Sequence, residues 1–170
     1  MNKEQLQAAQ APIKERYRAE PDAGLLTLRA EGRIGEQITC RVETGKAMVE
    51  AGLHPATGGP GTFACSGDML LEALVACAGV TLAAVATSIG VELRTGVVRA
   101  EGDLDFRGTL GVSREAPVGF RDIRLSFELD SDAPPEQLAK LCQLTERYCV
   151  VYQTLRQPPT IDVSLTTVKA

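Results

Sequence analysis

The chain has 170 residues, of which 44% are hydrophobic and 24% charged, and its formal net charge is −4. A chain of this size folds as one ordinary domain, and a composition near the globular average excludes disordered and fibrous proteins. Aromatic residues make up only 4%, there is no Trp, and no run of Lys or Arg occurs. We therefore expect neither a nucleic acid nor an anionic membrane surface as a partner.

Cysteine usage indicates a reducing compartment. The chain has five cysteines, an odd number, and its polar start at Met1–Gln5 lacks the apolar segment of a secretory leader. There is no Cys-x-x-Cys pair and His54 is the single histidine, so the sequence predicts no structural zinc site. We expect a cytoplasmic protein with reduced thiols.

The first fifty residues predict a helical arm followed by antiparallel strands. Residues 3–17 have a helical composition, and Pro12 is expected to interrupt the helix. Alternation of apolar and polar residues then predicts three strands, with a turn at 32–35 after the first. These strands lie within 26–31, 38–42 and 46–49.

A long apolar helix is predicted after the Gly-rich loop His54–Gly61. Met69–Ala86 carries a single charge, Glu72, and Ser66 and Gly90 are expected to cap the helix. Such a segment is either a membrane span or a helix in a protein core. The lack of flanking Lys or Arg and the alternating strands around it favour the core. Because a small sheet cannot cover all its faces, we expect a homodimer.

The remainder alternates between strands and a second helix. Strands are predicted within 91–106 and 120–130, and Asp132 is expected to cap a helix opened by Pro134-Pro135. A last strand is predicted at 161–165. The apolar stripe of the second helix comprises Leu138, Leu141, Cys142, Thr145, Tyr148 and Cys149.

This order of elements, with mostly antiparallel strands, defines the α+β class. We interpret residues 1–22 as an N-terminal helical arm and residues 23–170 as a single domain. No internal repeat indicates a second domain.

The residues alone do not single out a reactive thiol. Cys77 in the apolar helix and Cys149 at the end of the second helix are both typical of small buried side chains. Cys65 directly precedes the predicted helix and is a candidate for a reactive thiol, and Cys40 lies on the apolar face of a strand. Cys142 and Cys149 share a helix face and lie about 10.5 Å apart along the axis, so they cannot bond each other while that helix is intact.

Two segments make the sequence similar to a known family. They are Gly67–Cys77, entered from the Gly-rich loop, and Cys149–Leu155, which follows the second helix. Together they resemble the OsmC/Ohr family of thiol-dependent hydroperoxide reductases, over about Leu26 to Val168. The resemblance implies an OsmC-like fold, with antiparallel sheets around long central helices in an intertwined homodimer.

The resemblance also implies a mechanism. Cys77 matches the peroxidatic thiol, which attacks an organic hydroperoxide and becomes a sulfenic acid. Cys149 matches the resolving thiol, which condenses with it to a Cys77–Cys149 disulfide. A dithiol donor, such as a lipoyl-type reductant, then restores the thiols, and no metal or organic cofactor takes part.

Activation of the thiolate is the point where the sequence departs from the family. The family places an arginine near the thiol, and Arg33 is the best positional match, with Arg41 second. The glutamate that holds this arginine in the family is replaced here by Gly67. His54 is a further candidate, as a base or hydrogen-bond donor.

Two other interpretations remain open at this stage. One is an OsmC-like dimer that binds a small apolar molecule or senses redox state without efficient turnover. The other is a structural relative whose cysteines only fill the core. A measurement of peroxide consumption separates the peroxidase from these two interpretations.

Overall fold

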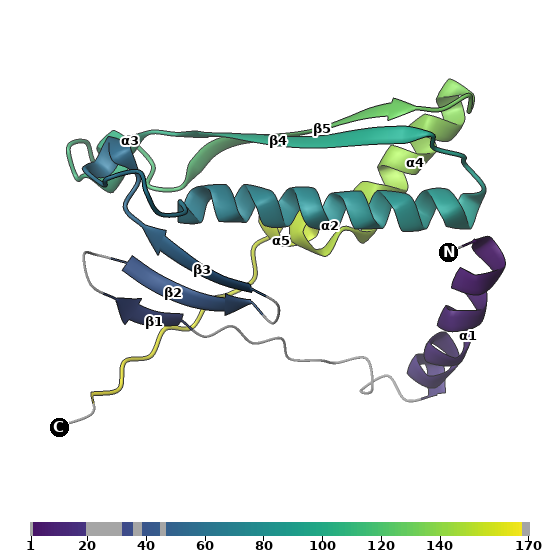
Figure 1. The fold of residues 1–170 in the computed structure, drawn as a ribbon, viewed down its shortest axis with the longest axis horizontal. Helices are drawn as coiled ribbons and strands as arrows, with labels where there is room; N and C mark the ends of the chain where they lie inside the picture. The colour runs from purple at the N-terminus through teal and green to yellow at the C-terminus, as the bar shows by residue number, and fades with distance from the viewer. Residues whose placement is uncertain (1, 20–31, 36–38, 45–46, 168–170) are drawn as a thin grey trace.

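A computed structural model describes residues 2–19, 32–35, 39–44 and 47–167, and for the first two strands the description is of the backbone. The helix α2 runs through the middle of the molecule (Figure 1), with the β4–β5 pair along one side and the C-terminal helices along another. In chain order the described elements are α1 (Lys3–Ala19), β1 (Gly32–Gly35), β2 (Thr39–Thr44), β3 (Ala47–Gly52), the 3-10 helix η2 (Pro55–Thr57), α2 (Ser66–Ile89), β4 (Thr95–Leu104), α3 (Phe106–Thr109), β5 (Phe120–Asp130), α4 (Pro135–Tyr148) and α5 (Val150–Arg156).

The described strands form two antiparallel sheets, one ordered β1-β2-β3 and the other made of β4 and β5. The predicted turn at 32–35 is wrong, because these residues pair with β2 and form β1. Arg33 therefore lies in a strand, opposite Arg41 in the register, and Arg41 lies opposite Glu50 of β3. The predicted strand at 26–31 falls outside the described residues.

The predicted apolar helix is confirmed and is longer than expected. It begins at Ser66 with Cys65 rather than Ser66 as its N-cap, and it ends at Ile89 with Gly90 as its C-cap, whose φ of 77° is left-handed. Its buried residues recur every four positions, which places them on one face. They are Leu74, Ala78, Leu82 and Ala86.

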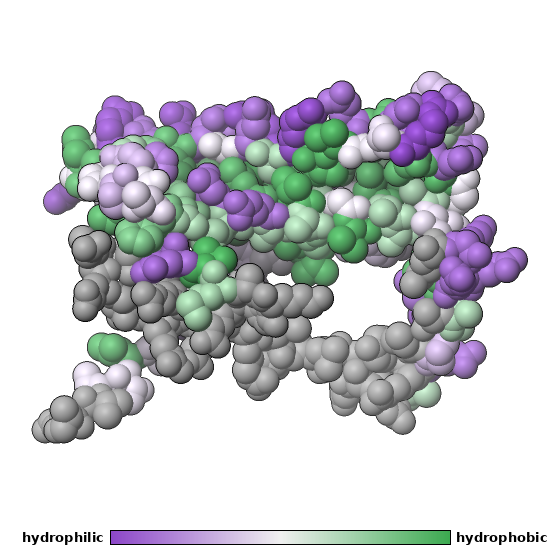
Figure 2. Space-filling model, in the orientation of Figure 1, coloured by the Kyte–Doolittle hydropathy of each residue, from purple (hydrophilic) through white to green (hydrophobic). Residues whose placement is uncertain are grey.

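The other faces of α2 remain largely open. By length and composition it is the one helix among the described residues that is long and apolar enough to cross a membrane, but it packs against β4, α4 and α5 as a core helix does. Only 22% of its most apolar window is buried, and Val80 is 73% exposed. In the view of Figure 2, hydrophobic residues run along the middle of the molecule, where α2 lies, and hydrophilic residues lie above them, over the β4–β5 pair.

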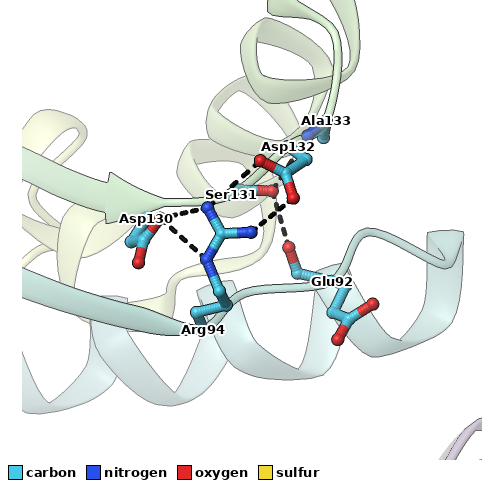
Figure 3. Close-up of polar contacts among 6 residues, drawn as sticks. All are labelled: Glu92, Arg94, Asp130, Ser131, Asp132 and Ala133. Atoms are coloured by element: carbon cyan, nitrogen blue, oxygen red, sulfur yellow. Dashed lines mark hydrogen bonds and ion pairs between the residues drawn. The ribbon is translucent and has the colours of Figure 1, made fainter.

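A cluster of ion pairs closes the end of the molecule where α2 turns into β4. The Arg94 guanidinium binds Asp130 at the end of β5 and Asp132 before α4, with an Nε to Oδ1 distance of 3.0 Å to Asp130 (Figure 3). The Ser131 hydroxyl donates to the main-chain oxygen of Glu92 at 2.6 Å. Asp132 is therefore an ion-pair partner, and the prediction that it caps α4 is wrong. The N-cap of α4 is Pro134.

Three further predictions differ from the structure. Helix α1 continues through Pro12, although a proline removes one main-chain donor and its ring crowds the preceding turn. Tyr148, the last residue of α4, belongs to the predicted apolar stripe but is 58% exposed, whereas Cys149 of the same stripe is buried. The predicted strand at 161–165 is irregular, with Ile161, Val163 and Leu165 each at least 79% exposed, because no described strand pairs with it.

Candidate active site

The first candidate thiol, Cys77, is held by the central helix. It lies next to Ala78, which is fully buried, and its own side chain is half-buried among residues that pack on Leu74, Ala78 and Cys149. Every fourth residue of α2 faces inward, so Cys77 stands at the border of the buried stripe. A rigid helix interior thus fixes the direction of the Cys77 side chain.

The second candidate thiol, Cys149, lies at a break between two helices. Helix α4 ends at Tyr148 and α5 begins at Val150, while Cys149 has an extended backbone with φ −73° and ψ 109° and serves both as C-cap and as N-cap. Its amide still donates to the main-chain oxygen of Thr145 at 2.9 Å. The Cys149 side chain is completely buried, and the chain changes direction around it.

The structure brings these two thiols together. Burial alone raises the pKa of the Cys77 thiol, but hydrogen bonds from the Val151 amide, the Cys149 thiol, the Val150 amide and the Thr81 hydroxyl lower it below its ordinary value. For Cys149, burial is the main cause of a raised pKa, and the neighbouring Cys77 raises it further. One member of the pair is thus favoured as thiolate and the other as thiol.

This division of protonation suits a nucleophile and a second thiol that donates to it. The thiolate is the reactive form of cysteine, and the protonated partner provides a hydrogen bond until it reacts itself. The remaining described cysteines, Cys65 and Cys142, are also free thiols. Burial raises the pKa of Cys142, and the charge of Glu146 raises it further, which keeps Cys142 protonated.

Cys65 and His54 lie together at the N-terminal end of α2. They line a hollow of about 250 Å³ with Asp68 and Glu72, and Cys77 is not part of it. The His54 ring stacks on Phe106 at 4.9 Å between centroids, and its Nδ1 accepts a hydrogen bond from the Ala56 amide. Asp68 and Glu72 precede Cys77 by nine and five residues, so these two lining residues lie about 14 Å and about 7.5 Å from Cys77 along the helix axis. The structure does not bring His54 and Cys77 together.

The family resemblance implied three positions for activation of the Cys77 thiolate, which are Arg33, Arg41 and Gly67. Arg33 lies in β1 and Arg41 opposite it in β2, and their side chains fall outside the description. At Gly67, a Cβ would stand 3.5 Å from Cys65 Sγ and 3.5 Å from Phe120 Cζ, which is ordinary contact. A side chain at the glutamate position of the family would thus lie between Cys65 and Phe120.

Sequence reasoning named Cys149 as the partner of Cys77 but missed three other groups that contact its sulfur, the Thr81 hydroxyl and the amides of Val150 and Val151. Thr81 follows Cys77 by four residues on the same helix, a spacing that was readable from the sequence. The amides of Val150 and Val151 were not readable, because any residue carries an amide and only the break at Cys149 directs these two toward Cys77.

A groove of about 720 Å³ lies beside the thiol pair, between β5 and α5. Its lining includes Leu74, which shares a buried cluster with Cys149, and Ile123, Tyr152 and Leu155 pack against that cluster. Neither Cys77 nor Cys149 is itself part of the lining. The lining also carries charged side chains, which are Arg121, Asp122, Arg124, Glu146 and Arg156. Within the described part of the chain, no three His, Cys, Asp or Glu side chains are grouped so that they could hold a metal ion. The site thus combines two neighbouring thiols with a groove that has both apolar and charged side chains in its lining.

The fold and this site define an α+β protein with a thiol pair, one thiol on the central helix and the other at a helix break. The profile of the OsmC-like protein family matches residues 59–164, and the chain belongs to this family. A comparison with curated proteins finds no match.

Solved structures share the OsmC-like fold. An OsmC-like protein from Mycoplasma pneumoniae aligns with a TM-score of 0.66 and 14% identity, over 78% of this chain and 89% of that one. An organic hydroperoxide resistance protein OsmC from Legionella pneumophila gives 0.62 and 16%, over 79% and 92%. The organic hydroperoxide resistance protein OhrB of Bacillus subtilis gives 0.53 and 19%, over 79% and 94%.

Proposed function

We propose that the protein is a thiol-dependent peroxidase that reduces organic hydroperoxides. The Cys77 thiolate attacks the terminal peroxide oxygen, the O–O bond breaks, and the alcohol leaves with a proton while Cys77 becomes a sulfenic acid. The Cys149 thiol then displaces water from this sulfenic acid and forms the Cys77–Cys149 disulfide. A dithiol donor, such as a lipoyl-type compound, reduces the disulfide and is itself oxidised to a disulfide.

The observation that carries this proposal is the contact between the two thiols. Hydrogen bonds, including one from Cys149, outweigh burial and lower the pKa of Cys77, which is what a nucleophilic thiol requires. The adjacent groove has Leu74, Phe120 and Leu155 in its lining, and such a surface suits the carbon chain of an organic hydroperoxide. Relatives in fold carry the name organic hydroperoxide resistance protein.

The decisive experiment measures peroxide consumption with cumene hydroperoxide and a dithiol donor. We expect turnover by the wild type, none by Cys77→Ser, and a single oxidation without further turnover by Cys149→Ser. Cys142→Ser is the matched control and should remain active, since Cys142 is held protonated. Peptide mapping after one equivalent of peroxide should find the Cys77–Cys149 bond.

One outcome contradicts the peroxidase, and another reassigns its resolving thiol. If the wild type consumes no peroxide but an apolar ligand raises its Tm, the protein is a binding or redox-sensing member of the family. If mapping finds Cys65 or Cys142 bonded to Cys77, the resolving role moves to that residue.

We also propose an intertwined homodimer in the cytoplasm. The exposed apolar faces of α2, with Val80 73% exposed, and the exposed residues Ile161, Val163 and Leu165 support a second copy as their cover. An interface larger than about 2,000 Å² would be typical of such an obligate dimer. A stable monomer in light scattering at micromolar concentration would exclude it.

Arg33 is proposed to assist the Cys77 thiolate, with Arg41 as the alternative. Arg33→Gln should then slow Cys77 alkylation at neutral pH more than Arg41→Gln does, and the reverse ranking transfers the role. His54 is proposed as a weaker contributor. Its stacking on Phe106 and its bond from Ala56 support a part in loop stability, so His54→Ala should affect Tm before it affects the thiol.

A further inference from the structure

The break between α4 and α5 is bridged by side chains. A helix end leaves its last main-chain carbonyls without partners, and the carbonyl of Glu146 is one of these in α4. The Gln153 side chain reaches back from α5, and its Nε2 donates to this carbonyl at 2.7 Å. One helix thus supplies the missing partner of the other across Cys149.

A second bridge uses the side chain of the same glutamate. The Tyr152 hydroxyl donates to Glu146 Oε2 at 3.1 Å, and Arg156 Nη1 donates to the Tyr152 hydroxyl oxygen at 3.3 Å. Tyr152 and Gln153 are neighbours on α5, so both bridges connect the start of α5 to the last turn of α4. Together they fix the angle between the two helices.

These bridges lie directly beside the thiol pair. The Tyr152 ring packs against the cluster of Leu74, Ala78 and Cys149, and Cys149 is completely buried there. The amides of Val150 and Val151, which belong to the same turn as Tyr152, donate to the Cys77 sulfur. A change in the angle of the break would therefore move Cys149 and both amides away from Cys77.

We propose that Glu146, Tyr152 and Gln153 form a brace, a set of positioning residues that hold the helix break so that the Cys149 thiol and two amides face Cys77. None of the three touches the Cys77 sulfur through its side chain in this arrangement, so they act through Cys149 and the backbone. The part of the proposal that concerns disulfide closure rests on the proposed peroxidase function. The part that concerns Cys77 reactivity does not.

The test uses the full chain with the substitutions Tyr152→Phe and Gln153→Ala, which remove one bridge each. We expect Cys77 alkylation by iodoacetamide to shift to higher pH, and disulfide closure after one equivalent of peroxide to slow by about threefold to tenfold for each lost hydrogen bond. Tyr148→Phe and Gln143→Ala are matched controls on α4, both at exposed positions, and should behave as wild type.

Substitutions at Glu146 separate positioning from general stability. Glu146→Gln keeps a side-chain oxygen that accepts from Tyr152 and should retain the wild-type pH profile, whereas Glu146→Ala should behave as Tyr152→Phe does. A purely structural brace would lower Tm in both brace variants without moving the pH profile. That outcome, or wild-type closure in Tyr152→Phe and Gln153→Ala, overturns the proposal.

The outcomes also distinguish the brace from the peroxidase. A wild type that consumes no peroxide, together with brace variants whose alkylation profile shifts, supports the brace and refutes the proposed function. A wild type that consumes peroxide, together with brace variants indistinguishable from it in closure and alkylation, refutes the brace alone.

Discussion

The two halves of α2 carry the same spacing of buried residues but differ in what packs on them. Toward its C-terminus, Leu82 and Ala86 join Val91 and Leu141 in a cluster of aliphatic side chains, and the Arg94 ion pairs close that end. Toward its N-terminal half, Leu74 and Ala78 instead meet Cys149 at the break between α4 and α5. There the core includes two thiols and the main-chain amides that donate to one of them.

The difference shows how one helix serves both stability and chemistry. An uninterrupted α4 presents only side chains to α2, so the contact is apolar and has no free donors. A broken helix presents main-chain amides as well, and these lower the free energy of a thiolate. The comparison predicts that substitutions in the two clusters have separable effects.

The largest effect is expected at the aliphatic end. Leu141 is completely buried, so Leu141→Ala should lower the free energy of unfolding by about 2–5 kcal/mol and leave the pH profile of Cys77 alkylation unchanged. Leu74→Ala should cost a similar amount but also expose Cys149 to alkylation, because Leu74 packs on it. Urea unfolding at one protein concentration, followed by alkylation of the folded variants, measures both. Equal thiol reactivity in the two variants would contradict the separation.

The next effect concerns the thiol contact. Cys149→Ala removes a donor to Cys77 and should shift alkylation of Cys77 to higher pH, because the pKa of Cys77 rises when the hydrogen bond is lost. Cys149→Ser retains a hydroxyl that donates, so its pH profile of Cys77 alkylation should fall between those of the wild type and Cys149→Ala. With excess peroxide both variants should accumulate sulfinic acid at Cys77, detected by mass spectrometry. A profile in Cys149→Ala identical to the wild type would remove Cys149 from thiolate stabilisation.

A smaller effect is expected from the hydroxyl on α2. Thr81→Val removes one donor to Cys77 and should slow alkylation at pH 7 by about fivefold, which corresponds to a hydrogen bond of about 1 kcal/mol. Thr87→Val is the control, since the Thr87 hydroxyl donates at 2.8 Å to the Ala83 carbonyl of the same helix, at the aliphatic end. Equal slowing in both variants would indicate a general effect on the helix.

The smallest effect is expected from the ion pairs at the opposite end. Arg94→Gln should lower Tm only slightly, because these pairs are exposed and screened by salt, and it should leave Cys77 alkylation unchanged. The hydrogen bond from Arg94 lowers the pKa of Asp130 below its ordinary value of 3.8, so the carboxylate contributes stability above that pH and loses it as the pH falls. The Tm difference between the wild type and Arg94→Gln should therefore be present at pH 7 and shrink below about pH 4. A Tm difference that grows as the pH falls would contradict the attribution of this effect to the Asp130 carboxylate.

Much of the secondary structure followed from periodicity. Strict alternation located β5 at Phe120–Asp130, the apolar run located α2, and the helical stripe correctly placed Leu141, Thr145 and Cys149 in the core. These succeed because local spacing alone decides which side chains share a face. The resemblance to OsmC-like proteins, drawn from Gly67–Cys77 and Cys149–Leu155, is confirmed by the family match.

The failures lie where a distant segment decides the outcome. Asp132 has the local chemistry of a helix cap, but Arg94, 38 residues earlier, binds it instead. The alternating residues at 161–165 suit a strand, yet a strand forms only where a neighbour supplies hydrogen bonds, and no described strand does so.

The sequence by itself determined the α+β class, the central helix, the two cysteines worth testing and the family. The tertiary structure decided that Cys149 falls at a helix break rather than within a helix, and that this break turns a thiol and two amides toward Cys77. The physical reason is that an amide has no signature in a sequence. Which amides remain free to donate, and what they face, depends on where a helix ends and on what packs across from that end.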